Sequence, residues 1–346
     1  MEPTHEREIT EPVDLCTPDG RRLAPEARGW SRTPLHTANL RGSWGRTKRW
    51  DYWAVLAGDL TAAVTYADVD YLGMATVWWC DLATGETGGR PIELPLARGV
   101  ALPDRPGATP LTYRGKGASV EIVDDPEGTS IEATWSEKDG RPGRLSLRVE
   151  LPAGHESVNV VIPWSDRRFQ YTSKHQARPA SGSLTVGGER RGIGVDEGGS
   201  EAWGVLDVGR GRWPYSTRWN WGGGAGRSTT GAVVGVQFGA MWTEGTGFTE
   251  NGVIIDGRVT KIGQELTWDY DGDRPLEPWR VHHPDGSLDL TLAARHDRHS
   301  RTNAVVLFSE VHQVFGTWKG HVTDDAGTIH QVEALQGFAE ESRSRW

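Results

Sequence analysis

Residues 145–151 read Leu-Ser-Leu-Arg-Val-Glu-Leu, an alternation of apolar and polar side chains that decides the fold class. The same alternation recurs at 130–135, 158–162 and 287–292. Because successive side chains of a β-strand point to opposite faces, a two-residue period is typical of a strand buried on one face. Turn pairs such as Asp139-Gly140 separate these segments, so the sequence predicts antiparallel strands joined by tight turns.

Helices are expected to be rare, because the chain contains 45 glycines and 19 prolines. Only residues 333–342 are predicted to form a short helix. Many short strands at regular spacing favour barrels or sandwiches. We therefore expect an all-β fold of two antiparallel β-barrels, or one large β-sandwich. An N-terminal arm is expected at 1–41, a first barrel domain at 42–200 and a second at 201–346.

Composition excludes several partner classes. The 346 residues include 38 basic and 47 acidic side chains, a net charge of -9, which argues against nucleic acid or an anionic membrane as partner. Cys16 and Cys80 are far apart and flanked by no metal-binding pattern, as expected for a reduced, cytoplasmic protein. No apolar stretch reaches membrane-spanning length, so no membrane span is expected.

Residues 209–221, Gly-Arg-Gly-Arg-Trp-Pro-Tyr-Ser-Thr-Arg-Trp-Asn-Trp, mix aromatic rings with fixed charges. The chain has 17 tryptophans against 6 phenylalanines and 7 tyrosines, a bias that simple core filling does not need. Wide rings with a polar N–H suit a concave surface that holds a small organic molecule. The alternative is that many of these tryptophans only fill the barrel interiors.

Familiar cofactor and metal motifs are incomplete. The glycine run at 222–226 precedes a strand rather than a helix, so a flexible turn is predicted instead of a phosphate loop. Asp269–Asp273 lacks the glycine of a calcium loop. His296 and His299 are three residues apart and point to opposite faces of a strand, as do the neighbours His282 and His283. Neither a cofactor nor a metal is expected.

Titratable residues accompany the tryptophans at predicted strand ends. Asp207 enters the tryptophan-rich segment, and an acid between indole faces has its pKa raised by desolvation, which would let it donate a proton at neutral pH. An ion pair between Asp207 and Arg210 is the competing interpretation. The catalytic candidates are Asp207, Glu250, Lys174 and His175. The candidate ligand contacts are Asp51, Tyr52, Trp53, Arg210, Trp213, Tyr215, Trp219, Asn220, Trp221 and Asn251.

Several blocks resemble a bacterial family, the domain of unknown function 2804. They include Gly29-Trp-Ser-Arg-Thr-Pro-Leu35, Trp50-Asp-Tyr-Trp53, the segment from Asp207 to Trp221, and Gly337-Phe-Ala-Glu340. More distantly, the chain is similar in architecture to the two-domain lipocalin-like superfamily of carotenoid 1,2-hydratases and tocopherol-cyclase-like proteins. The resemblance implies two lipocalin-like barrels with a ligand cavity, and it transfers no catalytic residue.

Three functions are open at this point. The leading hypothesis is a protein that binds a small, largely apolar molecule and performs cofactor-free hydration, isomerisation or cyclisation, as a lyase or an isomerase. Asp207 or Glu250 would donate the proton, indole faces would stabilise positive charge, and Lys174, Arg210 and Asn220 would orient the substrate. A non-catalytic carrier or sensor is the second hypothesis. A carbohydrate-active protein with two carboxyl groups across an open groove is the third.

Overall fold

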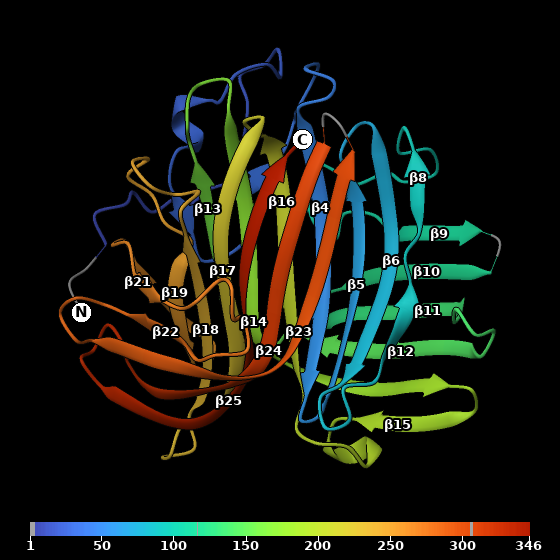
Figure 1. The fold of residues 1–346 in the computed structure, drawn as a ribbon. Helices are drawn as coiled ribbons and strands as arrows, with labels where there is room; N and C mark the ends of the chain where they lie inside the picture. Colours follow the sequence, from blue (N-terminus) through green and yellow to red (C-terminus); the bar gives the residue numbers. More distant parts are fainter. Residues whose placement is uncertain (1–3, 116, 305–306) are drawn as a thin grey trace.

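A computed structural model describes residues 4–115, 117–304 and 307–346, and its regular secondary structure is almost entirely β-strand (Figure 1). Within these ranges the only helical turns are two short 3-10 helices, η1 (Pro25–Ala27) and η2 (Val195–Glu197). None of the helices among the described residues is long or apolar enough to span a membrane. The expected all-β class is confirmed, and the strands form two curled antiparallel sheets.

The first sheet contains, within the described residues, 14 strands in the order β7-β6-β5-β4-β16-β14-β12-β11-β10-β9, with β13, β15, β2 and β8 paired off this path. Its strands are β2 (Trp30–Ser31), β4 (Thr47–Ala57), β5 (Leu60–Asp68), β6 (Leu72–Asp81), β7 (Thr87–Arg90), β8 (Glu93–Pro95), β9 (Leu111–Gly115), β10 (Ala118–Asp125), β11 (Gly128–Ser136), β12 (Pro142–Glu150), β13 (Val158–Ile162), β14 (Phe169–Val186), β15 (Glu189–Ile193) and β16 (Trp203–Arg212).

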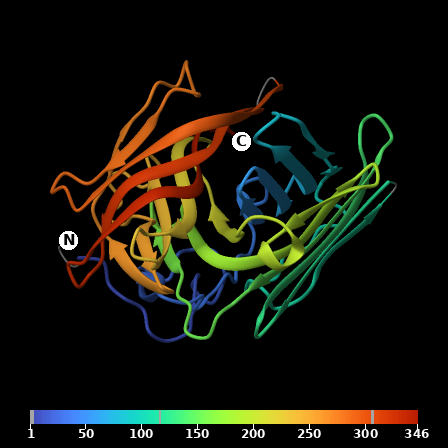
Figure 2. The same cartoon turned by 90° about the horizontal axis from the view of Figure 1, so that it is seen from below.

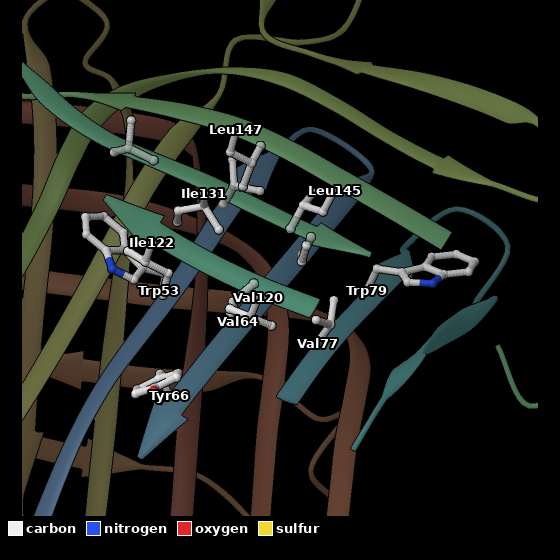
Figure 3. Packing of buried hydrophobic residues seen from close by; sticks show 14 of the residues in the cluster. Trp53, Val64, Tyr66, Val77, Trp79, Val120, Ile122, Ile131, Leu145 and Leu147 are labelled. Carbon is white, nitrogen blue, oxygen red and sulfur yellow. The ribbon is translucent and has the colours of Figure 1, made fainter. Parts of the chain in front are cut away.

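A bend in the long strand β14 curls this sheet onto itself. The register between β14 and β16 shifts between His175 and Arg178, and Ala177 has a φ of 58°. A bulge of this kind kinks a strand and increases its twist. As a result β4–β6 face β10–β12, and side chains such as Trp53, Val64, Ile122 and Leu145 fill the space between them (Figure 3).

The second sheet has nine strands among the described residues, in the order β20-β19-β18-β17-β25-β24-β23-β22-β21. Its strands are β17 (Ser216–Arg227), β18 (Val233–Ala240), β19 (Asn251–Ile255), β20 (Arg258–Ile262), β21 (Thr267–Asp269), β22 (Trp279–His282), β23 (Leu288–Ala304), β24 (Leu307–Thr323) and β25 (Ile329–Arg345). Its own core contains Phe238, Trp279, Leu290, Val314 and Trp318, all buried. Figures 1 and 2 show the two curled sheets side by side, with β14 next to β17 and β18 and β4 next to β25.

The N-terminal segment lies over the first sheet and joins it only through β2, which pairs with β13. Its parallel pair β1 (Val13–Asp14) and β3 (His36–Thr37) packs on Phe169 and Tyr171 of β14. Glu6 reaches the second sheet, where it accepts a hydrogen bond from Lys261 at 2.7 Å. The change of sheet falls between Arg212 and Ser216, whereas the domain boundary expected at residue 200 stays a prediction, because strand pairing alone does not define folding units.

The helix predicted at 333–342 is wrong, since these residues belong to β25. A bulge opposite Trp318 and Gly320 places both Val332 and Leu335 on the buried face, which interrupts the two-residue period at the start of this segment. The turn predicted at 222–226 is also wrong, because this glycine run is part of β17. A Cβ on Gly223 would lie 2.4 Å from the Gln176 side chain, so glycine lets the bulge of β14 approach the second sheet closely.

Candidate functional site

A cavity of about 350 Å³ lies between the two sheets rather than inside either of them. Both curled interiors are filled by their own apolar cores, so the cavity walls are the faces that the sheets turn toward each other. The residues that line it are Trp50, Tyr52, Thr65, Ala67, Val69, Met74, Thr172, Lys174, Asp207, Trp213, Trp219, Trp221, Trp242, Glu250, Arg298, Ser300, Ser309, Val311, Gln313, Glu340, Ser344 and Trp346.

Strand alternation selects which side chains reach this cavity. On β14, Thr172 and Lys174 face the cavity, whereas the intervening Ser173 hydrogen-bonds Asn159 behind the sheet. On β17, Trp219 and Trp221 face the cavity in the same way. Each wall therefore presents every second residue of its strands, and the residues between them point to the opposite face of the sheet.

Lys174 is the charged centre of the site. Its Nζ lies 2.8 Å from Asp207 Oδ1, 3.2 Å from Glu250 Oε2 and 4.4 Å from the centroid of the Trp221 ring. Burial lowers the pKa of Lys174, but attraction to Asp207 and Glu250 outweighs burial, so its pKa is raised above the ordinary value. The ammonium therefore stays charged although the residue is buried.

Asp207 is held as the partner of this ammonium. Its Oδ1 also accepts a hydrogen bond from Thr172 Oγ1 at 3.3 Å, and its Oδ2 accepts one from Trp50 Nε1 at 3.0 Å. The carboxylate is thus satisfied from three directions by groups on neighbouring strands. Such a fully bonded carboxylate is suited to fixing Lys174 in place.

Glu250 is one of two buried carboxyl groups suited to exchange a proton. Its Oε1 accepts a hydrogen bond from Trp242 Nε1 at 3.0 Å, whereas Oε2, close to Lys174, has no aligned hydrogen bond. Burial raises the pKa of Glu250 to about 7; Lys174 opposes the rise, and Asp207 adds to it. A carboxyl group with this pKa exists in both protonation states at neutral pH.

Glu340 on β25 is a second acid of the same kind. Its Oε1 accepts a hydrogen bond from Trp219 Nε1 at 2.7 Å. Burial raises the pKa of Glu340 to about 7, while the bond from Trp219 and the charge of Lys174 lower it. Two carboxyl groups that titrate near neutrality therefore face one tryptophan-walled cavity.

Six tryptophans form a continuous cluster at this end of the cavity, and Trp213 is its centre. The Trp213 ring stacks on Trp242 at a centroid distance of 5.4 Å and contacts Trp50 at 5.7 Å and Trp219 at 5.8 Å. Trp164 and Trp346 complete the cluster at 5.0 and 5.8 Å from Trp213. This arrangement presents fixed apolar surface next to the titratable groups.

The far wall supplies a polar patch. Gln313 Oε1 accepts hydrogen bonds from Tyr52 OH and Arg298 Nη1, each at 3.3 Å. The Arg298 guanidinium also lies 4.5 Å from the Trp78 ring. A ligand in the cavity would therefore meet tryptophan faces at one side and a guanidinium at the other.

Seven of the sequence-predicted residues meet in the cavity, and seven do not. The first set comprises Tyr52, Lys174, Asp207, Trp213, Trp219, Trp221 and Glu250. The residues outside it are Asp51, Trp53, His175, Arg210, Tyr215, Asn220 and Asn251. Most of the second set occupy alternate positions on the same strands and therefore face away.

The competing ion pair between Asp207 and Arg210 is not formed. Asp207 lies in the middle of β16, not at a strand end, and Arg210 is on the opposite face of that strand, where its Nη2 lies 2.7 Å from Asp51 Oδ1. Burial raises the pKa of Asp51, against the attraction of Arg210. Trp53 packs in the core of the first sheet (Figure 3).

The other predicted residues that lie outside the cavity have structural partners. His175 does not end a strand, because β14 continues to Val186, and its Nε2 is 3.0 Å from Ser173 Oγ. Asn220 donates to Tyr270 OH and Asn251 Oδ1 accepts from the Gly239 amide. Tyr215 is largely exposed and lies under the Arg46 guanidinium.

Sequence reasoning missed several residues of the site. Trp50, Thr172, Trp242, Arg298, Gln313 and Glu340 line the cavity but were not predicted. Glu340 stood in one of the family-like blocks, and the false helix concealed its position on a strand. Trp50 and Thr172 could have been found by extending the two-residue period outward from Tyr52 and Lys174.

The chain belongs to the family described as a domain of unknown function, DUF2804, whose model matches residues 6–346 and confirms the resemblance. No curated protein matches its sequence. Among solved structures, kievitone hydratase from Nectria haematococca aligns with a TM-score of 0.48 at 12% identity, covering 87% of this chain and 89% of that one. CghA aligns with a TM-score of 0.42 at 10% identity, covering 89% of this chain and 90% of that one. An AttH-type protein from Nitrosomonas europaea aligns with a TM-score of 0.43 at 14% identity, covering 86% of this chain and 92% of that one.

Proposed function

We propose that this DUF2804 protein binds a small, largely apolar organic molecule in the cavity between its sheets and transfers a proton to it without a cofactor. Hydration, isomerisation and cyclisation can all begin with such a transfer. The observation that carries the proposal is the pair of buried carboxyl groups, Glu250 and Glu340, that face the tryptophan-walled cavity with pKa values near neutrality.

The cavity supports binding of a small molecule by its size and its walls. A volume of about 350 Å³ lies within the range of small-molecule sites, roughly 300–1,000 Å³. Trp213, Trp219 and Trp221 offer apolar faces, and Arg298 offers a donor for a polar substituent. Arg298 thus takes the orienting role expected of Arg210 and Asn220, which point away from the cavity.

Glu250 is proposed as the acid. In its protonated form it would deliver its proton to an alkene carbon or a carbonyl oxygen. The carboxylate left behind gains the attraction of the Lys174 ammonium at 3.2 Å, which favours the transfer. Positive charge that develops on the substrate meets the π-face of Trp219. Glu340, on β25, would receive a proton from the resulting intermediate or from the attacking water.

Solvent-derived hydrogen in the product tests this proposal across a range of candidate substrates. We expect incubation in deuterated water with a panel of small alkenes, enones and polycyclic phenols to yield at least one compound that gains carbon-bound deuterium, detected by mass spectrometry. Glu250→Gln is expected to lower the rate at least about a hundredfold, because general acids contribute roughly 10²–10⁴. Glu340→Gln is expected to lower it as well.

Glu265→Gln is the matched control, because this glutamate bonds to Thr243 and is not among the residues that line the cavity. Its rate should equal that of the unmodified protein. Deuterium incorporation that survives both cavity substitutions would remove Glu250 and Glu340 from the mechanism.

A non-catalytic carrier is the second candidate, and the mutual pairing of Lys174 and Asp207 favours it, since that pair needs no substrate group to complete it. A carrier would bind a member of the panel, seen as a change in tryptophan fluorescence, and would return it without deuterium after long incubation. That outcome would leave the binding half of the proposal in place and exclude the chemistry.

A further inference from the structure

Outside the cavity, three metal-ligating side chains gather on neighbouring strands of the second sheet. His299 on β23 lies directly across from His312 on β24, and Glu310 precedes His312 by two residues. The potential ligand atoms of these three side chains all lie within 4.8 Å of one another. His299 Nε2 is 3.3 Å from Glu310 Oε1.

A fourth residue orients one of the imidazoles. His312 Nδ1 is 2.7 Å from Asp297 Oδ2, a contact that favours a proton on Nδ1 and leaves the lone pair on Nε2 for a metal. Carboxylates that hold metal-bound histidines in this way are a regular feature of zinc sites. The other carboxylate oxygen, Asp297 Oδ1, is buried without a hydrogen-bond partner among the described residues.

From this arrangement we propose that His299, His312 and Glu310 form a site for a divalent transition-metal ion, with Zn²⁺ as the best match. Two imidazole nitrogens and one carboxylate oxygen are a common zinc ligand set, with a water as fourth ligand. Tetrahedral coordination needs ligand atoms about 3.3 Å apart, so separations of up to 4.8 Å would have to shorten on binding. The two rings are stacked at 4.1 Å, and binding would rotate them until their lone pairs converge.

The site lies on the outer face of the cavity wall. His299 alternates with Arg298 and Ser300, and His312 with Val311 and Gln313, all four of which line the cavity from the other side of the same strands. An ion here would clamp β23 to β24 directly behind Arg298 and Gln313. The sequence concealed this site because its histidines pair across strands, not along one.

Arg301 competes with the metal for the carboxylate. Its Nη1 lies 3.7 Å from Glu310 Oε1, and the side chain is mostly exposed. Removing this cation would release Glu310 and reduce repulsion of an incoming divalent ion. We therefore expect substitution of Arg301 to raise the affinity for the metal, whereas substitution of a ligand lowers it.

Titration of the full chain with Zn²⁺, followed by calorimetry and by native mass spectrometry, tests the proposal. We expect one ion per chain and a rise in melting temperature with added Zn²⁺, and Co²⁺ should show the visible absorption of a four-coordinate ion. His299→Gln and His312→Gln should abolish the stoichiometric site. Asp297→Asn should weaken it about 10–100-fold, and Arg301→Gln should strengthen it.

His321→Gln is the control, because His321 also lies on β24 but bonds to the Gly286 carbonyl instead of a second ligand. It should bind Zn²⁺ as the unmodified chain does. Binding that is weak, non-stoichiometric or unaffected by His299→Gln and His312→Gln would overturn the proposal. Circular dichroism of each variant without metal would verify that it is folded.

Discussion

Replacing Lys174 with methionine is expected to lower the free energy of unfolding by about 3–5 kcal/mol, the usual cost of removing one partner of a buried ion pair. Lys174 is only 4% exposed and is the cation that faces both Asp207 and Glu250. Without it, these carboxyl groups would lose the counter-charge that they share. Urea unfolding monitored by circular dichroism measures the loss.

Because the loss of stability comes from carboxyl groups without a counter-charge, we expect it to depend on pH. In mildly acidic buffer Glu250, whose pKa burial already raises to about 7, takes up a proton, so the loss should be smaller than in mildly alkaline buffer. Lys319→Met is the matched control, because Lys319 forms an exposed pair with Glu333 and should change stability by less than about 1 kcal/mol. Equal losses for the two variants would contradict the account of Lys174 as a buried charge.

Replacing Trp213 with alanine is expected to cost about 3–5 kcal/mol as well, in this case by opening a void in the tryptophan cluster. Trp213 is 4% exposed, contacts five other indole rings and donates its Nε1 hydrogen to Gln170 Oε1 at 2.8 Å. The substitution therefore removes packing and takes this hydrogen bond away from a buried amide. Calorimetric unfolding and tryptophan fluorescence would both report it.

Trp44→Ala provides the comparison for this second variant. Trp44 is 70% exposed, so its removal should change stability by less than about 0.5 kcal/mol. If Trp213→Ala were as mild as Trp44→Ala, the cluster would be a loose lining without a structural role. A large loss in both would indicate that exposed aromatic residues matter in a way that packing does not explain.

The sequence predicted the strands well because half-burial leaves a visible period. The alternating segments at 130–135 and 145–151 correspond to β11 and β12, with only Leu151 beyond the end of its strand. The segment at 158–162 corresponds to β13, which is buried at every position, and there Val161 breaks the alternation. The period disappears where a strand is buried on both faces or carries a bulge. Residues 333–342 failed for both reasons, since Phe338 packs toward the first sheet and Ala339 into the second.

The site was only partly predictable, because its residues come from strands that meet through folding and not through sequence spacing. Lys174 and Asp207 were both candidates, and the fold makes them direct cross-strand partners. Glu340 lies 90 residues beyond Glu250, and no local pattern connects them. Arg210 and Asp51 looked like site residues but form an ion pair on the opposite face of the sheet.

The central claim is that the cavity holds carboxylic acids that are partly protonated at neutral pH. Carbon-13 NMR titration of the glutamate side chains, with Glu250→Gln and Glu340→Gln used for assignment, tests it most directly. The account predicts that both resonances titrate at about pH 7, well above the ordinary value of 4.5. Titration of both groups near 4.5 would contradict it, because neither glutamate could then act as an acid at neutral pH.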